Sequence, residues 1–258
     1  MTEGNPLSGY DQAAAVRVMR DAVDRIVDSQ RDAVSAAALL CADALASGGI
    51  LQAFGTGHSQ SFAMEIAGRA GGFVAANKLA LKQLVMRGAA TPDEIVNPQA
   101  ERSVEFAQRL WQLHDIAQAD VFLIASNSGG NAATVEMARL AKENGNPVIA
   151  VTSMNHTAAI TSTHPSGSRL FEMADVVVDN CGVVGDCEIA LPEGTTITPA
   201  STVTGALIAQ MIVTETCGLL LARGAEVPVL TSVNVSEGKA RNDALEARYG
   251  TRVMKNEP

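Results

Sequence analysis

Apolar positions separated by three and four residues dominate the first part of the chain. Between residues 11 and 46 they form a stripe with one polar break around Gln30, so we predict a long helix that ends near Ser47. A short apolar run at 50–54 then leads into a glycine-rich turn that begins at Gly55. That run has the profile of a buried parallel strand.

Short apolar runs and amphipathic stretches continue to alternate along the chain. The pattern predicts strands at 73–76, 121–125, 148–151 and 175–179, and helices at 59–70, 99–118, 131–143 and 198–223, with 77–98 irregular. Thr198 followed by Pro199 is expected to cap the last helix. Strands that alternate with helices at this spacing predict an α/β fold, a parallel sheet with helices on both faces. We expect one domain over 1–258, with 11–46 as a helical N-terminal extension.

Composition and charge narrow the classes of partner. Hydrophobic residues make up 47% of the chain, which is ample for a core, and 28 acidic against 19 basic residues give a net charge of −9. Such an acidic chain lacks the basic surface that nucleic-acid binding needs, so no nucleic-acid partner is expected. We see no apolar run of about 18–20 residues and no secretory signal, so no membrane partner is expected either.

Four scattered cysteines bear on the cellular compartment. Cys41, Cys181, Cys187 and Cys217 show no disulfide framework, which suits a reducing, cytoplasmic environment. Cys181 and Cys187 are six residues apart and fit neither a metal motif nor a redox motif. We interpret them as free, inert thiols.

Two loops carry the candidate chemistry, because each follows a predicted strand at the edge where open parallel sheets bind ligands. The first covers 55–61 (GTGHSQS) and the second covers 126–131 (SNSGGN). Each is rich in glycine and hydroxyl groups, and each opens a helix whose first N–H groups are unpaired, which suits a phosphate. For either loop alone, an ordinary helix cap is the alternative interpretation.

Common cofactor and hydrolase motifs do not account for these loops. The GxGxxG pattern would need glycine where Gln60 stands, and the neutral Asn77 replaces its acidic ribose anchor. The one Gly-Lys pair is followed by Ala240, so no nucleotide P-loop is present. The sequence around Ser59 approaches a nucleophile elbow but lacks the closing glycine. No cofactor is therefore expected.

The two loops and their surroundings resemble the SIS (sugar isomerase) domain family of phosphosugar isomerases and phosphosugar-binding proteins. FGTGHSQSFAMEIAGR is similar to the family's first loop and helix, and IASNSGGNAATVEMARLAKENGNPVIAVTS to its phosphate loop, helix and next strand. HPSGSRLFEMADVVVDNCG and TPASTVTGALIAQMIVTE are similar to a branch related to phosphoheptose isomerase. The resemblance covers most of residues 11–249. It implies a flavodoxin-like α/β/α sandwich with a five-stranded, mainly parallel sheet that binds a sugar phosphate.

The resemblance also implies site residues and an oligomer. The substrate-binding positions that it assigns are Gly57, Ser59, Ser126, Asn127, Ser128, Gly129, Gly130, Asn131, Ser201 and Thr202. Phosphoheptose isomerases hold a metal partly through the last long helix, but that helix has no histidine here, so no metal is expected. The family often forms homo-oligomers with sites at subunit contacts. Because the 11–46 and 198–223 helices offer more apolar surface than one sheet face covers, we expect a homodimer or homotetramer.

An aldose–ketose isomerisation moves a proton between adjacent carbons, so it needs a base and a group that handles the sugar oxygens. Glu65 resembles the catalytic glutamate of phosphoheptose isomerases, and an ion pair with Arg69 is its alternative role. His58 lies in the first loop beside the expected ligand. Glu215, on an apolar helix, either points into the site or pairs with a cation elsewhere in the fold or in an adjoining subunit.

The other histidines receive different expectations. His164 lies in a polar loop after a strand and could reach a neighbouring site, whereas His114 and His156 are taken as surface residues.

Three candidate functions remain open for this sequence. The first is an aldose–ketose isomerase of a phosphorylated sugar, and the others are a non-catalytic phosphosugar sensor and an amino-sugar phosphate lyase or etherase.

Overall fold

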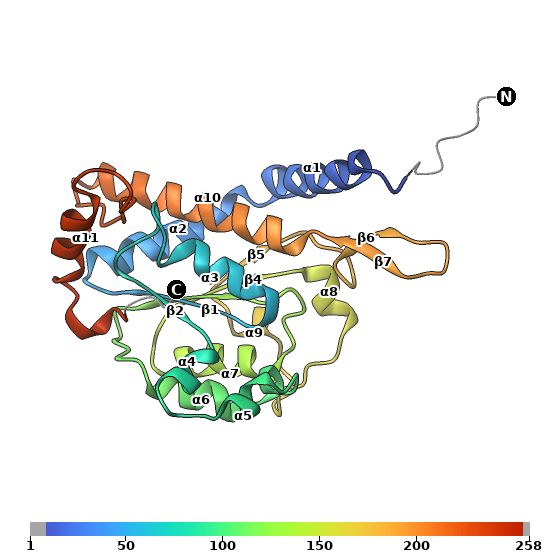
Figure 1. Cartoon of the computed structure of the whole chain (residues 1–258), viewed down its shortest axis with the longest axis horizontal. Coiled ribbons are helices and arrows are strands. Elements are labelled where there is room, and N and C mark those ends of the chain that lie inside the picture. Colours follow the sequence, from blue (N-terminus) through green and yellow to red (C-terminus); the bar gives the residue numbers. More distant parts are fainter. Residues whose placement is uncertain (1–8, 255–258) are drawn as a thin grey trace.

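A parallel sheet of five strands forms the centre of the structure, a computed structural model that describes residues 9–254 (Figure 1). Its strands are β1 (Leu51–Gly55), β2 (Ala76–Leu79), β3 (Val121–Ala125), β4 (Val148–Thr152) and β5 (Val176–Asp179). They lie in the order β2-β1-β3-β4-β5, and every neighbouring pair is parallel. The α/β prediction with a five-stranded parallel sheet is confirmed.

Helices cover both faces of this sheet. One layer holds α1 (Gln12–Ser29), α2 (Arg31–Ala46), α3 (Gln60–Ile66) and α10 (Ser201–Ala222), and the opposite layer holds α4 (Lys82–Met86), α5 (Pro92–Val96), α6 (Val104–Gln112) and α7 (Ala132–Glu143) (Figure 1). Successive strand residues point to opposite faces, so the core divides in two. Leu123 packs with the α2–α3–α10 layer, whereas its neighbours Phe122 and Ile124 pack with the α6–α7 layer.

The remaining helical elements are four short segments that precede α11 in the chain, α11 itself and one short segment after it. The short segments are η1 (Gly57–Ser59), η2 (Ala100–Arg102), α8 (Met154–Ala159) and α9 (Leu170–Met173). Near the C-terminus, α11 (Gly238–Glu246) precedes η3 (Gly250–Arg252). In Figure 1, α8 lies beyond one end of the strands and α11 lies beyond the opposite end.

The predicted N-terminal helix and the second strand differ in detail from the structure. The polar break at Gln30 is the junction between α1 and α2, and the Gln30 Oε1 accepts a hydrogen bond of 2.9 Å from the Asp179 N–H. The second strand begins at Ala76 rather than at Phe73. Phe73 instead forms isolated bridges with Ala67 and Val229, so its apolar character reflects burial outside the sheet.

The predicted cap of the last long helix is wrong. Thr198 and Pro199 belong to β7 (Thr196–Pro199), which pairs with β6 (Cys187–Ala190) in an unpredicted hairpin. The helix α10 begins at Ser201, where Asp186 caps it: its Oδ1 accepts from the Ser201 N–H at 2.9 Å and its Oδ2 from the Ser201 Oγ at 2.6 Å. A carboxylate from a distant residue therefore supplies the cap.

Asp120 ties the C-terminal segment to the start of the sheet. This side chain is fully buried directly before β3. Its Oδ1 accepts hydrogen bonds from the Ile50 N–H at 2.9 Å and from the Arg252 Nη2 at 2.6 Å, and its Oδ2 accepts one from the Gln52 Nε2 at 2.9 Å. The buried carboxylate is thus paired and hydrogen-bonded, as burial of a charge requires.

The expectation that no segment is long and apolar enough to span a membrane is wrong for α10. By length and composition alone, Ser201–Ala222 passes that test, and within residues 9–254 it is the one helix that does. The core helix of a soluble protein passes the same test. Here Ile208, Ala209 and Ile212 of α10 are buried in the core that α10 forms with α2 and α3.

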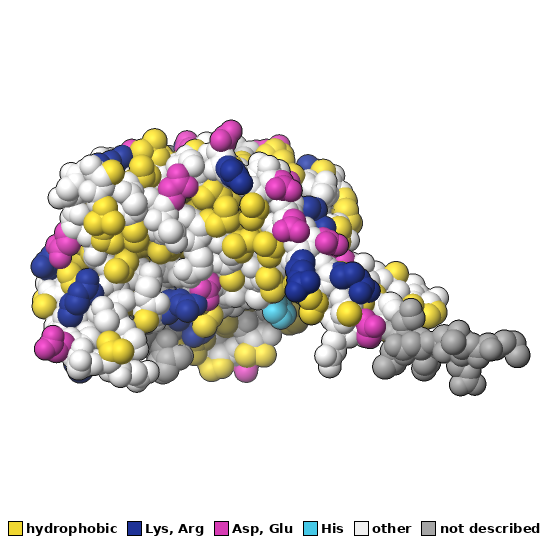
Figure 2. All heavy atoms as spheres, turned by 90° about the horizontal axis from the view of Figure 1, so that it is seen from above, with side chains coloured by type: hydrophobic (Ala, Val, Ile, Leu, Met, Phe, Trp, Pro, Cys, Tyr) yellow, Lys and Arg dark blue, Asp and Glu magenta, His cyan; other side chains and the backbone are white. Residues whose placement is uncertain are grey.

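Hydrophobic side chains also remain exposed on the outer surface of this helical layer. Figure 2 views the layer from outside and shows hydrophobic side chains gathered in patches, with acidic and basic side chains between them. The exposed large hydrophobic residues of α1, α2 and α10 are Val16, Leu39, Val203 and Leu221. An apolar surface of this kind is typical of a protein contact.

We predict that the chain is a homodimer or homotetramer that buries this surface. Light scattering at micromolar concentration should give a multiple of the 26.8 kDa chain mass. Combining Val16→Asp with Val203→Asp should weaken the association at least about tenfold, because it places charges in an apolar contact. Val96→Asp is the matched control, since Val96 is 80% exposed on α5, in the opposite layer. A monomeric wild-type chain would contradict the prediction.

Candidate functional site

The two candidate loops meet at one point of the sheet edge. The loop 55–61 leaves β1 and the loop 126–131 leaves β3, and these strands are neighbours. The chain continues from β1 into α3 on one face and from β3 into α7 on the other. Such a reversal is a topological switch point, where open α/β sheets bind ligands.

The 126–131 loop presents several unpaired donors. Within the described chain, the backbone N–H groups of Asn127, Ser128, Gly130 and Asn131 have no acceptor. The Gly129 N–H instead donates to the Ser126 Oγ at 3.1 Å, which bends the loop into a tight turn. A concave run of free N–H groups is an anion-binding arrangement. The predicted phosphate loop therefore has the donors that its role requires.

The glycines of this loop pack closely against the residues behind it. A Cβ added at Gly129, where φ is +63°, would lie 2.8 Å from the Thr152 Oγ1. A Cβ at Gly130 would lie 2.3 Å from the Ile160 Cδ1. A larger residue at Gly129 would be strained by its positive φ, and one at Gly130 would require the Ile160 side chain to move.

A second segment holds the loop from behind. The Gly130 carbonyl accepts hydrogen bonds from the Thr163 N–H at 2.8 Å and from its Oγ1 at 3.1 Å. The Thr163 Oγ1 also accepts from the Ala132 N–H at 3.0 Å, at the start of α7. His164, the next residue, is buried, and its Nε2 lies 3.0 Å from the Glu136 Oε2. His164 thus anchors this segment to α7.

A small pocket joins the two loops to the start of α10. It measures about 20 Å³, room for about one water molecule. Of the predicted site residues, it is lined by His58, Ser59, Ser126, Asn127, Ser201 and Thr202. Asn180, which follows β5, lines it as well. The structure therefore gathers the assigned polar groups from both loops and from α10 around one point.

A wider hollow lies on the other side of the first loop. It has a volume of about 380 Å³ between that loop and residues 81–101, and Gly57, Lys82 and Glu101 help to line it. The Glu101 Oε2 lies 3.6 Å from the position that a Cβ on Gly57 would take. Its carboxylate makes no hydrogen bond or ion pair within the described chain. Sequence reasoning missed Glu101, because it lies at the start of the predicted helix 99–118 and belongs to neither candidate loop; the structure places it in η2.

Two of the three predicted acid–base residues do not face these cavities. Glu65 forms the ion pair with Arg69, and its Oε2 accepts a hydrogen bond of 2.7 Å from the Gln210 Nε2 of α10. Glu215 lies fourteen residues beyond Ser201 on α10, about 21 Å along the helix axis. It lines a shallow groove with Arg31 and makes no ion pair within the described chain. Only His58, which is exposed, lines the pocket.

Two histidines that were expected at the surface have other positions. His114 is buried, its Nε2 lies 3.1 Å from the Gln83 Oε1, and burial together with nearby Arg87 lowers its pKa to about 4. His156 is half-buried at the start of α8, and its Nδ1 lies 3.3 Å from the Asn127 Nδ2. The surface expectation is therefore wrong for His114, and His156 contacts the candidate phosphate loop.

The cysteines and the metal-binding residue types show no second site. All four cysteines are free, and burial raises the pKa of Cys41 to about 12 and also raises that of Cys181. The thiols of Cys41 and Cys181 therefore stay protonated near neutral pH. Over residues 9–254, no group of three or more His, Cys, Asp or Glu residues is placed to hold a metal ion.

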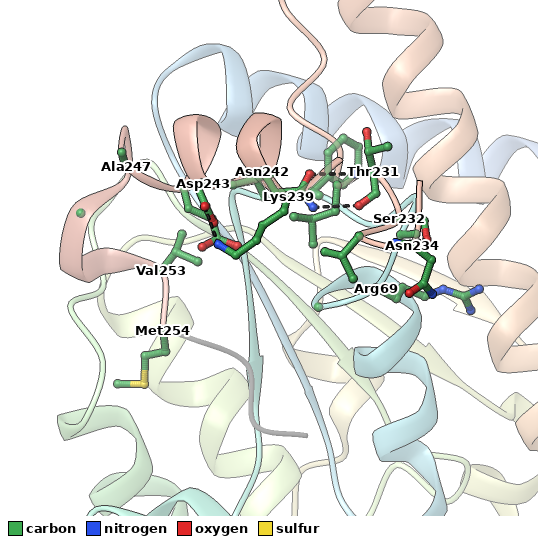
Figure 3. A pocket seen from close by; sticks show the side chains of 18 residues that line it. Arg69, Thr231, Ser232, Asn234, Lys239, Asn242, Asp243, Ala247, Val253 and Met254 are labelled. Carbon is green, nitrogen blue, oxygen red and sulfur yellow. Dashed lines mark hydrogen bonds and ion pairs between the residues drawn. The ribbon is translucent and has the colours of Figure 1, made fainter. Parts of the chain in front are cut away.

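A separate hollow lies away from the two loops. It has a volume of about 970 Å³ and is lined by the turn after α3, the 230–234 segment, α11 and the C-terminal residues (Figure 3). Its polar side chains bind one another: Lys239 pairs with Asp243, and Asn242 bonds to the Thr231 backbone (Figure 3). Because it lies near the amino ends of the strands, we place the functional site at the two loops instead.

Comparison with known proteins shows the domain family of this chain and a group of relatives within it. A model of the SIS domain matches residues 16–153, more than half of the chain, so the chain belongs to the SIS domain family. Within that family it belongs with the UPF0309 proteins. The one from Halalkalibacterium halodurans is 34% identical over 228 residues, covering 88% of this chain and 93% of that protein. The one from Streptomyces coelicolor is 36% identical over 255 residues, covering 98% and 99%.

Solved structures of phosphoheptose isomerases share the fold. The enzyme from Francisella tularensis matches with a TM-score of 0.54 and 15% identity, covering 79% of this chain and 95% of that one. The enzyme from Neisseria gonorrhoeae matches with a TM-score of 0.54 and 19% identity over the same shares. At these identities the likeness shows the fold, and the expected SIS-type α/β architecture is confirmed.

Because of the buried Glu136, which contacts His164, the free energy of unfolding should fall as the pH is lowered. Hydrogen bonds from Arg139, and then from Gln108 and His164, lower its pKa from 4.5 to about 2. Its contribution to the free energy of unfolding is therefore present above about pH 4.5 and is lost as the pH falls toward 2. We predict that wild type loses about 2 kcal/mol more than Glu136→Gln between pH 5 and pH 3 in urea unfolding. Glu143→Gln, at an exposed partner of Arg139, is the control, and parallel curves for wild type and Glu136→Gln would contradict the prediction.

Proposed function

We propose that this protein binds a phosphorylated sugar and interconverts its aldose and ketose forms. The observation that carries the proposal is the row of unpaired N–H groups between Asn127 and Asn131, at the switch point of the sheet. Ser126 and Ser128 add two hydroxyl groups to the same loop. Membership of the SIS domain family and the fold shared with phosphoheptose isomerases support this substrate class.

The phosphate group would lie against the 126–131 loop at the start of α7. Free N–H groups and the positive end of a helix both favour a dianion. The start of α10 approaches the same pocket, but its dipole already faces the carboxylate of Asp186. The loop before α7 is thus the better phosphate site.

The sugar would extend from the phosphate past the first loop toward the wider hollow. The 20 Å³ pocket holds about one water molecule, whereas the 380 Å³ hollow has room for a sugar. His58 lies at the first loop with its side chain exposed, where it can act on a sugar oxygen. A carboxylate that removes the proton from carbon completes the acid–base pair.

Two glutamates are candidates for that carbon base. The family resemblance favours Glu65, which becomes available if the sugar or a second subunit displaces Arg69 and Gln210. The geometry of this chain favours Glu101, which faces the first loop without a partner among the described residues. We keep Glu65 as the proposed base and use Glu101 as the competing residue in the test.

A specific observation favours non-catalytic phosphosugar binding as the second function. Glu65 is engaged by Arg69 and Gln210, and Glu215 is remote from both loops. A sensor would need the phosphate loop but no free carbon base. Both functions require sugar-phosphate binding, and only the isomerase should also exchange the proton at carbon 2.

The first test removes the two loop hydroxyl groups. Ser126→Ala combined with Ser128→Ala should lower the affinity for glucose 6-phosphate and related sugar phosphates by roughly a hundredfold or more, because each hydrogen bond to a charged group contributes about 1.5–3 kcal/mol. A thermal-shift titration measures it, since a ligand of the native state raises the melting temperature. Ser168→Ala, in a loop beyond the pocket, should change nothing. Unchanged affinity in the double variant would rule out the phosphate site.

The second test identifies the base through deuterium exchange at carbon 2 of a sugar phosphate that binds. Glu65→Gln should still bind but exchange at least about a hundredfold more slowly, because the amide keeps the shape and loses the basicity. Glu101→Gln is the matched comparison and should keep the wild-type rate. The opposite pattern would assign the base to Glu101. Binding without exchange in the wild type would favour the sensor.

A further inference from the structure

A chain of hydrogen bonds runs behind the candidate phosphate loop. The Gly182 N–H donates to the Asn180 Oδ1 at 3.0 Å, and the Asn180 Nδ2 donates to the Asn127 Oδ1 at 2.9 Å. The Asn127 Nδ2 then lies 3.3 Å from the His156 Nδ1. The chain therefore links the loops that follow β3, β4 and β5.

The backbone donor at one end sets the direction of every bond. Because Gly182 contributes an N–H group, Asn180 must turn its oxygen toward Gly182 and its nitrogen toward Asn127. Asn127 must then turn its own nitrogen toward His156. An amide nitrogen only donates, so the His156 Nδ1 has to accept, and the proton of the neutral ring must be on Nε2.

The far end of the chain closes back on Gly182. The His156 N–H donates to the Ser153 Oγ at 3.0 Å, and the Ser153 Oγ donates to the Gly182 carbonyl at 2.7 Å. A Cβ at Gly182 would lie 2.9 Å from the Asn180 Oδ1, so a larger residue here would displace the Asn180 amide. The closed ring holds the imidazole in place.

Asn127 is consequently fixed at both its backbone and its side chain. Its carbonyl accepts a hydrogen bond of 3.1 Å from the Ser153 N–H, and its amide is bound at both ends. Its own N–H, and that of Ser128, remain free to face a ligand. Fixing donors before binding reduces the cost of ordering them when the ligand binds.

We propose that His156 is a positioning residue of the phosphate site. As a neutral imidazole that accepts from Asn127, it holds the loop with its N–H groups directed at the phosphate. The inference rests on the proposed function, since it assigns His156 to that same site. It acts through Asn127 rather than on the sugar.

The first experiment measures affinity for inorganic phosphate by calorimetry at pH 8. His156→Ala should weaken binding about five- to tenfold, because it removes one hydrogen bond and frees the Asn127 amide. His156→Asn should stay within about twofold of wild type, since its side-chain oxygen takes the place of Nδ1. Ala158→Ser, at an exposed position of α8, is the matched control and should also stay within about twofold.

A double-mutant cycle tests whether His156 acts through Asn127. In an Asn127→Ala background, adding His156→Ala should change phosphate affinity by less than about twofold. An equal loss in both backgrounds would overturn the proposed coupling. Circular dichroism of each variant confirms that the fold survives, and His156→Asn keeps the test valid if His156→Ala does not fold.

Nuclear magnetic resonance of the imidazole nitrogens gives a readout that needs no ligand. Long-range nitrogen–proton spectra should show His156 with its proton almost entirely on Nε2, and Asn127→Ala should weaken that preference to the partial one of a free histidine. A proton on Nδ1 in the wild type would overturn the inference. If the wild type binds phosphate and His156→Ala binds it equally well, the inference fails while the proposed function stands. If the wild type does not bind phosphate, both fail.

Discussion

The direction in which the chain leaves β1 and β3 governs the rest of the site. From β1 it turns to the layer of α2 and α10, and from β3 it turns to the layer of α6 and α7. The two helices that follow cannot cover the sheet edge between these strands, so a gap stays open there. Both polar loops border that gap. Over residues 9–254, the N–H groups of Asn127, Ser128, Gly130 and Asn131 remain unpaired beside this gap.

A loop with free donors must be held by contacts on its other side. Thr163 binds the Gly130 carbonyl and the first turn of α7, and the Glu136–His164 pair fastens that segment to the helix. On the adjoining side, Asn180 and His156 bind the Asn127 amide. The side chains of Asn127 and His164 are thereby hydrogen-bonded, whereas the buried Thr157 Oγ1 behind Gly129 has no partner among the described residues. The free N–H groups of the loop are left for a ligand.

The carboxylates of the structure differ in whether their hydrogen bonds are already formed within the fold. Glu136 and Asp120 are buried and fully engaged in holding the fold, whereas Glu101 faces a hollow without a partner in the described chain. Glu65 lies between these extremes, because its two partners are a partly exposed arginine and a glutamine on the surface layer. The exposed apolar side chains of that layer include Val203, near the start of α10. An added subunit there would therefore lie near both Glu65 and the site.

The sequence by itself determined the sheet, the two loops and the polar break at Gln30, because periodicity and glycine-rich turns report local burial and local backbone geometry. It did not determine the contacts between residues far apart in the chain. The cap from Asp186 to Ser201, the burial of His114 and the bond from Asn127 to His156 have no periodic signal. Only the tertiary structure brings such polar pairs together, since each partner is an ordinary loop or helix residue until the fold places the other beside it.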